Sequence, residues 1–83
     1  MITFQKAEKE FLEWTRNNPN GFIVSCKSAN NMMLHRTYCT HFEFSEPFKH
    51  TAHEKVCSSA KHELEQWASK KTKALKYCSS CSP

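Results

Sequence analysis

The apolar residues of the N-terminal segment recur at intervals of three or four positions: Phe4, Ala7, Phe11 and Trp14. This spacing places them on one face of a helix. We therefore expect a helix from Thr3 to about Arg16, with Thr3 as its N-cap. Pro19 should end this segment, because proline lacks the backbone N–H and pushes the preceding residue out of the helical region.

A turn and two strands are expected next. Asn20 and Gly21 form a strong turn signal, and Gly21 is the only glycine of the chain, so we expect it to adopt a positive φ. The stretch "FIVSC" is rich in strand-forming residues, and "MMLHRTYC" alternates in the same way. The polar run "KSANN" between them predicts an antiparallel pair of strands joined by a loop.

The second half of the chain predicts a loop, a short strand and a helix. Residues 40–54 mix aromatic and polar side chains around Pro47, and "EKVC" reads as a third strand that ends at Cys57. A helix should then run from Ser58 to about Leu75, with Ser59 as its N-cap. Its apolar stripe would hold Leu64, Trp67, Ala68, the stem of Lys71, and Leu75.

These elements predict one α+β domain over residues 1–83. It has an N-terminal helix, a two- or three-stranded antiparallel sheet and a C-terminal helix. A chain of this length supports only a modest core, and such domains often add disulfides or a metal. The five cysteines are an odd number, which a set of disulfides alone would not use up.

The cellular compartment affects how these cysteines are interpreted. The segment "MITFQKAEKEFLEW" is charged throughout, without the apolar core of a secretory signal, and no apolar run reaches the length of a membrane span. We therefore expect a cytoplasmic, reducing location. There, a group of cysteines indicates a metal site more often than disulfides.

The cysteine spacing points to Zn²⁺. Cys78 and Cys81 form a Cys-x-x-Cys pair of the kind that supplies two zinc ligands. Cys39 and Cys57 end predicted strands, where a side chain can turn toward a shared site. Cys26 falls within a strand, as expected for a small buried hydrophobe. We therefore predict that Cys39, Cys57, Cys78 and Cys81 are the metal ligands.

The histidines leave an alternative open. His41 is two residues from Cys39 and could replace it as a ligand. His35 could hydrogen-bond a ligand or serve a binding pocket. The remaining histidines are expected to be structural or solvated: His50, His53 and His62.

Two enzymatic interpretations fit less well. The pairs His41-x-Glu43 and Cys78-x-x-Cys81 resemble parts of the zinc deaminase signature. However, Tyr77 stands where that signature has proline, the cysteines follow a helix, and the chain is short for a deaminase core. A thioredoxin-like site would need its cysteines at a helix N-terminus. We therefore expect no enzymatic activity, and a zinc site closed by four protein ligands.

The charge is unevenly distributed. The net charge is +4, and residues 66–83 contain Lys70, Lys71, Lys73 and Lys76 without any acid. A basic patch favours anionic partners, nucleic acid first. The simpler alternative is that these lysines complement the helix dipole and keep the domain soluble.

Several short stretches together resemble a known pattern: "NPNGFIVS", "LHRTYC", "KVC", "ELEQWA" and "CSSC". Over residues 14–81 the chain resembles an uncharacterised family of small bacterial zinc-binding domains, which is associated with prokaryotic defence and recognition of modified DNA. The resemblance implies that Cys39, Cys57, Cys78 and Cys81 form one site. It also draws attention to His35 and Arg36.

These observations lead to one functional prediction. His35 and Arg36 should lie on opposite faces of their strand, one toward the core or the metal and the other outward. We predict a zinc-binding module that binds nucleic acid, DNA before RNA, through His35, Arg36, Lys70, Lys71 and Lys73. The aromatic residues Phe42, Phe44 and Phe48 would either stack on bases or cover the core.

The alternative is a protein-interaction or inhibitory module on the same zinc scaffold. A protein partner or a fused nuclease domain fits either prediction, whereas a membrane partner fits neither. Affinity for nucleic acid falls steeply with salt, so salt dependence distinguishes the two functions.

Overall fold

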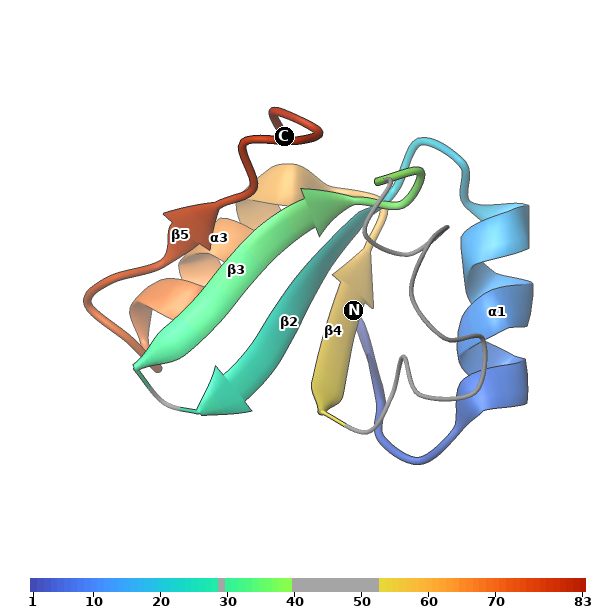
Figure 1. Ribbon diagram of the computed structural model, residues 1–83, viewed down its shortest axis with the longest axis horizontal. Coiled ribbons are helices and arrows are strands. Elements are labelled where there is room, and N and C mark those ends of the chain that lie inside the picture. Colours follow the sequence, from blue (N-terminus) through green and yellow to red (C-terminus); the bar gives the residue numbers. More distant parts are fainter. Residues whose placement is uncertain (29, 40–52) are drawn as a thin grey trace.

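The computed structural model describes residues 1–28, 30–39 and 53–83. They form one mixed sheet of five strands, in the order β1-β4-β2-β3-β5, with a helix on each face (Figure 1). The elements are β1 (Ile2–Phe4), α1 (Glu8–Asn17), β2 (Phe22–Ser28), β3 (Asn31–Arg36), β4 (Glu54–Ser58), α3 (Lys61–Ser69) and β5 (Lys76–Tyr77). The α+β class is confirmed, but the sheet is larger than expected and is not purely antiparallel.

Alternation along the strands divides the core into two parts, because successive side chains point to opposite faces of a sheet. On the face that α1 covers, Phe4, Ile23 and Cys57 pack against Phe11. On the other face, the buried strand residues pack against Leu64 of α3: Val24, Met32, Leu34 and Val56. Both helices are therefore held by apolar contacts with the same sheet.

The predicted start of the first helix is wrong. Residues Ile2–Phe4 form an edge strand that pairs with β4, and α1 begins only at Glu8. Pairing with β4 satisfies backbone groups that would otherwise line an open sheet edge. Lys6 makes the bend between strand and helix with a φ of 52°. Phe4 still packs against Phe11, with the ring centroids 5.8 Å apart in an edge-to-face arrangement, so both residues belong to the core despite the change of element.

Gly21 is required for a different reason than predicted. Its φ is not positive. A Cβ at this position would lie 2.8 Å from Cη2 of Trp14 and 2.9 Å from Oγ1 of Thr37. A larger residue at this position would therefore force the side chain of Trp14 or Thr37 to shift.

The predicted strands β2, β3 and β4 are confirmed, and β2 pairs with both of its neighbours in antiparallel register. The additional strand β5 runs parallel to β3, with Met33 opposite Lys76 and Leu34 opposite Tyr77. Parallel strands need a crossover connection, and here α3 leads the chain from β4 across the sheet to its far edge. Strand β5 has only the two residues Lys76 and Tyr77, too few to show an alternating pattern in the sequence.

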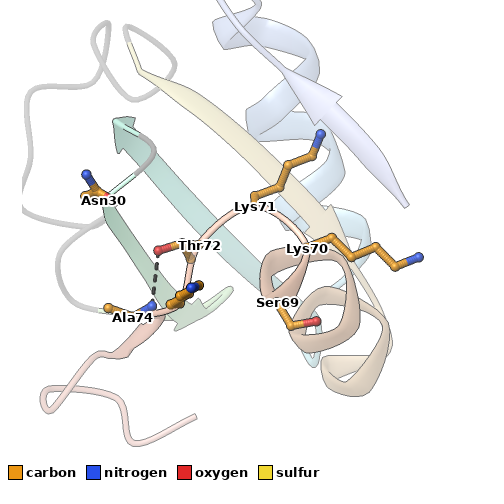
Figure 2. Close-up of a pocket in the computed structure, with 7 residues that line it drawn as sticks. Asn30, Ser69, Lys70, Lys71, Thr72 and Ala74 are labelled. Atoms are coloured by element: carbon orange, nitrogen blue, oxygen red, sulfur yellow. Dashed lines mark hydrogen bonds between the residues drawn. The ribbon is translucent and has the colours of Figure 1, made fainter.

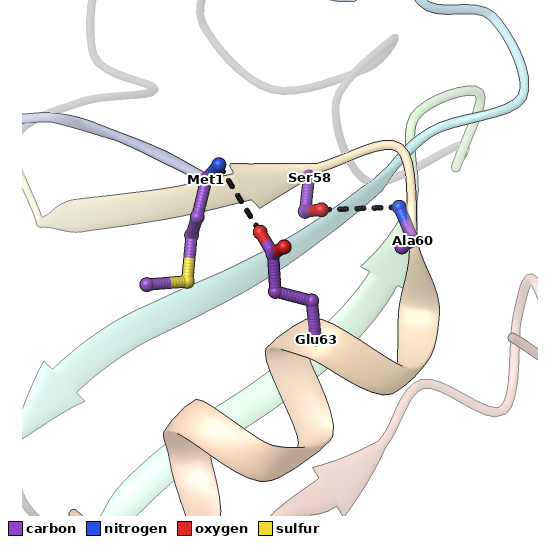
Figure 3. Close-up of polar contacts among 4 residues, drawn as sticks. All are labelled: Met1, Ser58, Ala60 and Glu63. Carbon is purple, nitrogen blue, oxygen red and sulfur yellow. Dashed lines mark hydrogen bonds and ion pairs between the residues drawn. The ribbon is translucent and has the colours of Figure 1, made fainter.

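The C-terminal helix is shorter than expected. It ends at Ser69 instead of near Leu75, and Leu75 reaches the core from the segment beyond the helix. The N-cap is Ala60, which makes no side-chain capping bond, so the predicted cap Ser59 is wrong. The Ala60 backbone N–H donates to Ser58 Oγ (3.0 Å), which forms a local turn just before the helix (Figure 3).

An ion pair lies beside the same helix start. The amino group of Met1 is 3.1 Å from Oε1 of Glu63 (Figure 3). Hydrogen bonds from this amino group and from Ser58 lower the pKa of Glu63. In the described part of the chain, neither helix is long and apolar enough to cross a membrane.

Candidate metal centre

Four metal-ligating side chains meet where β3 ends and the C-terminal segment passes it: His35, Cys39, Cys78 and Cys81. One donor atom from each residue lies within 4.8 Å of the donor atoms of the other three. His35, Cys39 and Cys78 are buried, and Cys81 is half-buried. Residues more than forty positions apart in the chain thus form one compact group that could hold a metal ion.

The parallel pairing of β3 with β5 brings the group together. Leu34 lies opposite Tyr77, so the next position along each strand places Cys78 beside His35. The Cys78 backbone N–H donates to the Leu34 carbonyl (3.0 Å), which continues the ladder by one bond. The chain after β5 then runs past the end of β3, as Figure 1 shows.

Cys39 reaches the group from the turn after β3. Its backbone N–H donates to the Arg36 carbonyl (3.0 Å), which curls the chain back toward His35. The Cys39 Sγ then lies 3.6 Å from His35 Nδ1 and 3.6 Å from Cys78 Sγ. The end of β3 and the turn after it therefore each contribute a donor to the same point.

The surroundings favour the thiolate form that a metal needs. Burial alone would raise the pKa of Cys78, but hydrogen bonds from the backbone of Cys81 and Ser80 and contacts with the Cys39 and Cys81 thiols lower it to about 7. The Arg36 backbone N–H also donates to Cys81 Sγ (3.3 Å). Such N–H···S bonds stabilise negative charge on sulfur.

Arg36 holds the C-terminal segment in place from outside the ligand set. Its Nε donates to the Cys81 carbonyl (3.1 Å) and its Nη2 to the Ser82 carbonyl (3.2 Å). The guanidinium lies over the rings of Phe22 (5.6 Å) and Tyr38 (6.0 Å). The side chain therefore points outward, as expected for one member of the His35–Arg36 pair, while its polar atoms bind the chain that carries Cys81.

The donor set fits a single soft or borderline cation. A tetrahedral zinc with Zn–S bonds of about 2.3 Å would separate its sulfur ligands by roughly 3.8 Å. The Cys39 and Cys78 sulfurs are 3.6 Å apart, close to that value. Thiolate and imidazole ligands suit zinc better than magnesium or calcium, which prefer oxygen.

Three of the four predicted ligands, Cys39, Cys78 and Cys81, lie in this group, but Cys57 does not. Cys57 of β4 lies opposite Ile23 of β2, and Ile23 lies opposite His35 of β3. The three residues form one row across the sheet, so the Cα atoms of Cys57 and His35 are about 10 Å apart. The fourth place in the group belongs to His35.

Cys57 lies instead in the apolar core under α1, with Phe4, Phe11 and Ile23. Burial raises the pKa of its thiol to about 12, although Lys55 opposes the shift. Cys26 is half-buried and packs against the core on the other face, in agreement with its predicted exclusion from the site. None of the five cysteines takes part in a disulfide.

The predicted nucleic-acid residues divide into two groups. His35 is only 5% exposed and belongs to the metal group, so it offers no surface to a partner. Lys70, Lys71 and Lys73 are exposed at the end of α3, around an open pocket of about 360 Å³ that also includes Asn30. Figure 2 shows the side chains of Lys70 and Lys71 extending outward in different directions.

One signal for His35 was present in the sequence. His35 and Cys39 are four residues apart, which allows a strand residue and a residue of the following turn to share a ligand site. The predicted alternative ligand His41 lies outside the described residues, as do Glu43, His50 and the aromatic residues Phe42, Phe44 and Phe48. His53 and His62 are exposed and are not part of the group.

Comparison with protein-family models, curated proteins and solved structures gave no match to this chain. The functional conclusions below therefore depend on the geometry of the metal group, on the surface around it and, for the choice of DNA, on the resemblance described above.

Proposed function

We propose that this chain is a small zinc-binding module whose metal is structural rather than catalytic. The observation that supports this most directly is the ligand set. His35, Cys39, Cys78 and Cys81 supply four donors within 4.8 Å of one another. Four protein ligands complete a tetrahedron, whereas a catalytic zinc keeps one position for water or substrate.

The position of the group gives the metal a clear structural task. Strand β5 has only two residues, and the chain beyond it contains little regular structure. A metal bound by His35 and Cys39 on one side and by Cys78 and Cys81 on the other would join this segment to β3. In such a site, the free energy of metal binding becomes free energy of folding.

Metal analysis combined with X-ray absorption tests the proposal. We expect one zinc per chain, with a first coordination sphere of three sulfur atoms and one nitrogen. Four sulfur atoms would instead bring Cys57 into the site. A coordinated water in place of a protein ligand, or no bound metal after purification without chelator, would contradict a structural zinc.

We further propose that the module binds nucleic acid, with DNA favoured by the resemblance to bacterial zinc domains. Support comes from the exposed lysines after α3, since none of the described residues that line their pocket carries a carboxylate. With His35 in the metal group, Lys70, Lys71 and Lys73 would provide the phosphate contacts. Their contribution is electrostatic and independent of sequence.

Charge reversal tests the second proposal. Replacing Lys70, Lys71 and Lys73 by Glu should abolish measurable DNA binding at low salt. The matched control reverses three exposed charges on the α1 side: Lys6, Lys9 and Arg16. Equal loss in both variants would indicate a general charge effect, and unchanged affinity in the first would exclude the lysines as the binding site.

A further inference from the structure

Two tyrosines are exposed near the metal group although both have large apolar rings. Tyr38 is 56% exposed and Tyr77 is 46% exposed. Each carries a cation over its ring: Arg36 lies 6.0 Å from the Tyr38 centroid, and Lys61 lies 5.6 Å from the Tyr77 centroid. An aromatic ring beside a cation offers a partner both a stacking surface and positive charge.

The two rings belong to one edge of the molecule. Tyr77 lies opposite Leu34, and Arg36 follows two residues later on β3, so the Cα atoms of Tyr77 and Arg36 are about 8 Å apart. Both side chains lie on the α3 side of the sheet: Tyr77 donates a hydrogen bond to Glu65, and Arg36 lies over Phe22. We call Tyr38, Arg36, Tyr77 and Lys61 the tyrosine strip.

The strip is held in position before any partner binds. The hydroxyl of Tyr77 is tied to Glu65 of α3. Arg36 donates hydrogen bonds to the carbonyls of Cys81 and Ser82. The segment that carries the metal ligand Cys81 therefore also fixes the guanidinium that lies over Tyr38. Ordering these side chains in advance lowers the entropic cost of binding.

The chemistry of the strip selects its partner. Proteins that bind single-stranded nucleic acid combine aromatic rings, on which bases stack, with basic groups that contact the backbone. Lys61 and Arg36 outnumber the acid Glu65 here. A duplex keeps its base faces stacked inside the helix and cannot use the rings in this way.

We propose that the tyrosine strip is a stacking platform for a single-stranded nucleic acid. This inference rests on the proposed function as a nucleic-acid-binding module and specifies its substrate as unpaired strands. The lysines after α3 lie near the start of β3, beside Asn30, and would contact the backbone of the same nucleic-acid strand there.

The test compares two fluorescein-labelled probes on the metal-loaded protein by anisotropy: an oligothymidine of about 15 nucleotides and a duplex of the same length. Tyr38→Ala and Tyr77→Ala should each weaken oligothymidine binding roughly 5- to 100-fold, which corresponds to one lost stacked base. Binding of the duplex should stay within about twofold of the wild type, because phosphate contacts are unchanged.

Two controls separate stacking from structural damage. Tyr38→Phe keeps the ring and should bind oligothymidine like the wild type. Tyr77→Phe keeps the ring but loses the hydrogen bond to Glu65, so it should lose less affinity than Tyr77→Ala. Ile2→Ala removes a side chain that is 43% exposed at the opposite sheet edge, and it should have no effect. Metal content of one ion per chain confirms that each variant retains the site.

The outcomes distinguish the inference from the function on which it rests. Unchanged oligothymidine affinity in both alanine variants, with loss on reversal of Lys70, Lys71 and Lys73, would overturn the platform and keep the nucleic-acid function. No binding of either probe by the wild type would overturn both. Displacement of oligothymidine by an acidic peptide at equal charge concentration would assign the strip to an acidic protein partner instead.

Discussion

Cys57 and Cys78 are both buried, with exposed fractions of 0% and 2%, yet their thiols differ chemically. The pKa of Cys57 is raised to about 12, whereas that of Cys78 is lowered to about 7. Cys57 packs among apolar rings under α1, while Cys78 accepts hydrogen bonds from the backbone of Cys81 and Ser80. The first environment protects a neutral thiol, and the second stabilises a thiolate.

The difference arises from strand order. Along one row of the sheet, Cys57 is separated from His35 by Ile23, while the register of β3 with β5 places Cys78 directly beside His35. Because Cys57 lies two strands away from His35, it is a core residue and not a member of the metal group. Residue type and spacing therefore do not identify a metal site until strand neighbours are known.

The largest expected effect is the loss of a ligand from the metal group. Cys78→Ala should abolish tight zinc binding and lower the free energy of unfolding by about 3 kcal/mol or more, because metal binding contributes to folding. For a domain of this size, this corresponds to a fall in melting temperature of about 12 °C or more. Calorimetry of the variant and of the wild type with excess chelator should give similar melting temperatures. A chelator without effect on the wild type would contradict a metal-stabilised fold.

The next effect concerns the support of the site by Arg36. Arg36→Ala removes the hydrogen bonds to the Cys81 and Ser82 carbonyls and should weaken zinc affinity about 10- to 100-fold. Arg36→Lys should recover little, since a lysine ammonium does not reproduce the planar donor geometry of a guanidinium. Competition with a chromophoric chelator measures both affinities. Wild-type affinity in Arg36→Ala would mean that the backbone alone positions Cys81.

Replacing Cys57 should affect stability without affecting the metal. Cys57→Ala leaves a small cavity beside Phe4 and Phe11 and should cost about 1–2 kcal/mol, with zinc content unchanged. Urea denaturation gives the stability, and elemental analysis gives the metal content. Loss of zinc from this variant would refute the assignment of His35 in its place.

The smallest effect is a pH dependence specific to Cys57. Its folded pKa of about 12 exceeds the ordinary value of 9.0, so its contribution to stability is complete below pH 9 and is lost as the pH rises toward 12. Between pH 8 and pH 10, the wild type should lose about 1 kcal/mol relative to Cys57→Ala. Urea denaturation of both proteins at the two pH values measures this difference. A constant difference would show that Cys57 is not shielded from water.

Much of the central sheet could be predicted from local patterns. The apolar alternation of "FIVSC", "MMLHRTYC" and "EKVC" marks β2, β3 and β4 correctly, because each side chain must face one of two cores. The helical spacing around Phe11 and the apolar positions of Leu64 and Ala68 are equally informative. These features depend on neighbours in the sequence.

The edges of the sheet could not be predicted in the same way. In the sequence, Ile2–Phe4 continues the apolar period of the helix. It forms a strand because its backbone pairs with β4, whose edge would otherwise be open. Lys76 and Tyr77 carry no strand pattern of their own, and their pairing with β3 depends on the path of α3 across the sheet. Both assignments require a partner strand that is distant in the sequence.

The sequence by itself determined that the chain is a small α+β domain and that Cys39, Cys78 and Cys81 are candidate ligands, because hydrophobic periodicity and cysteine spacing are local properties. Only the tertiary structure decided the fourth member of the group. His35 joins it and Cys57 does not, because ligand geometry depends on which strands are adjacent, and the parallel pairing of β3 with β5 is a long-range contact.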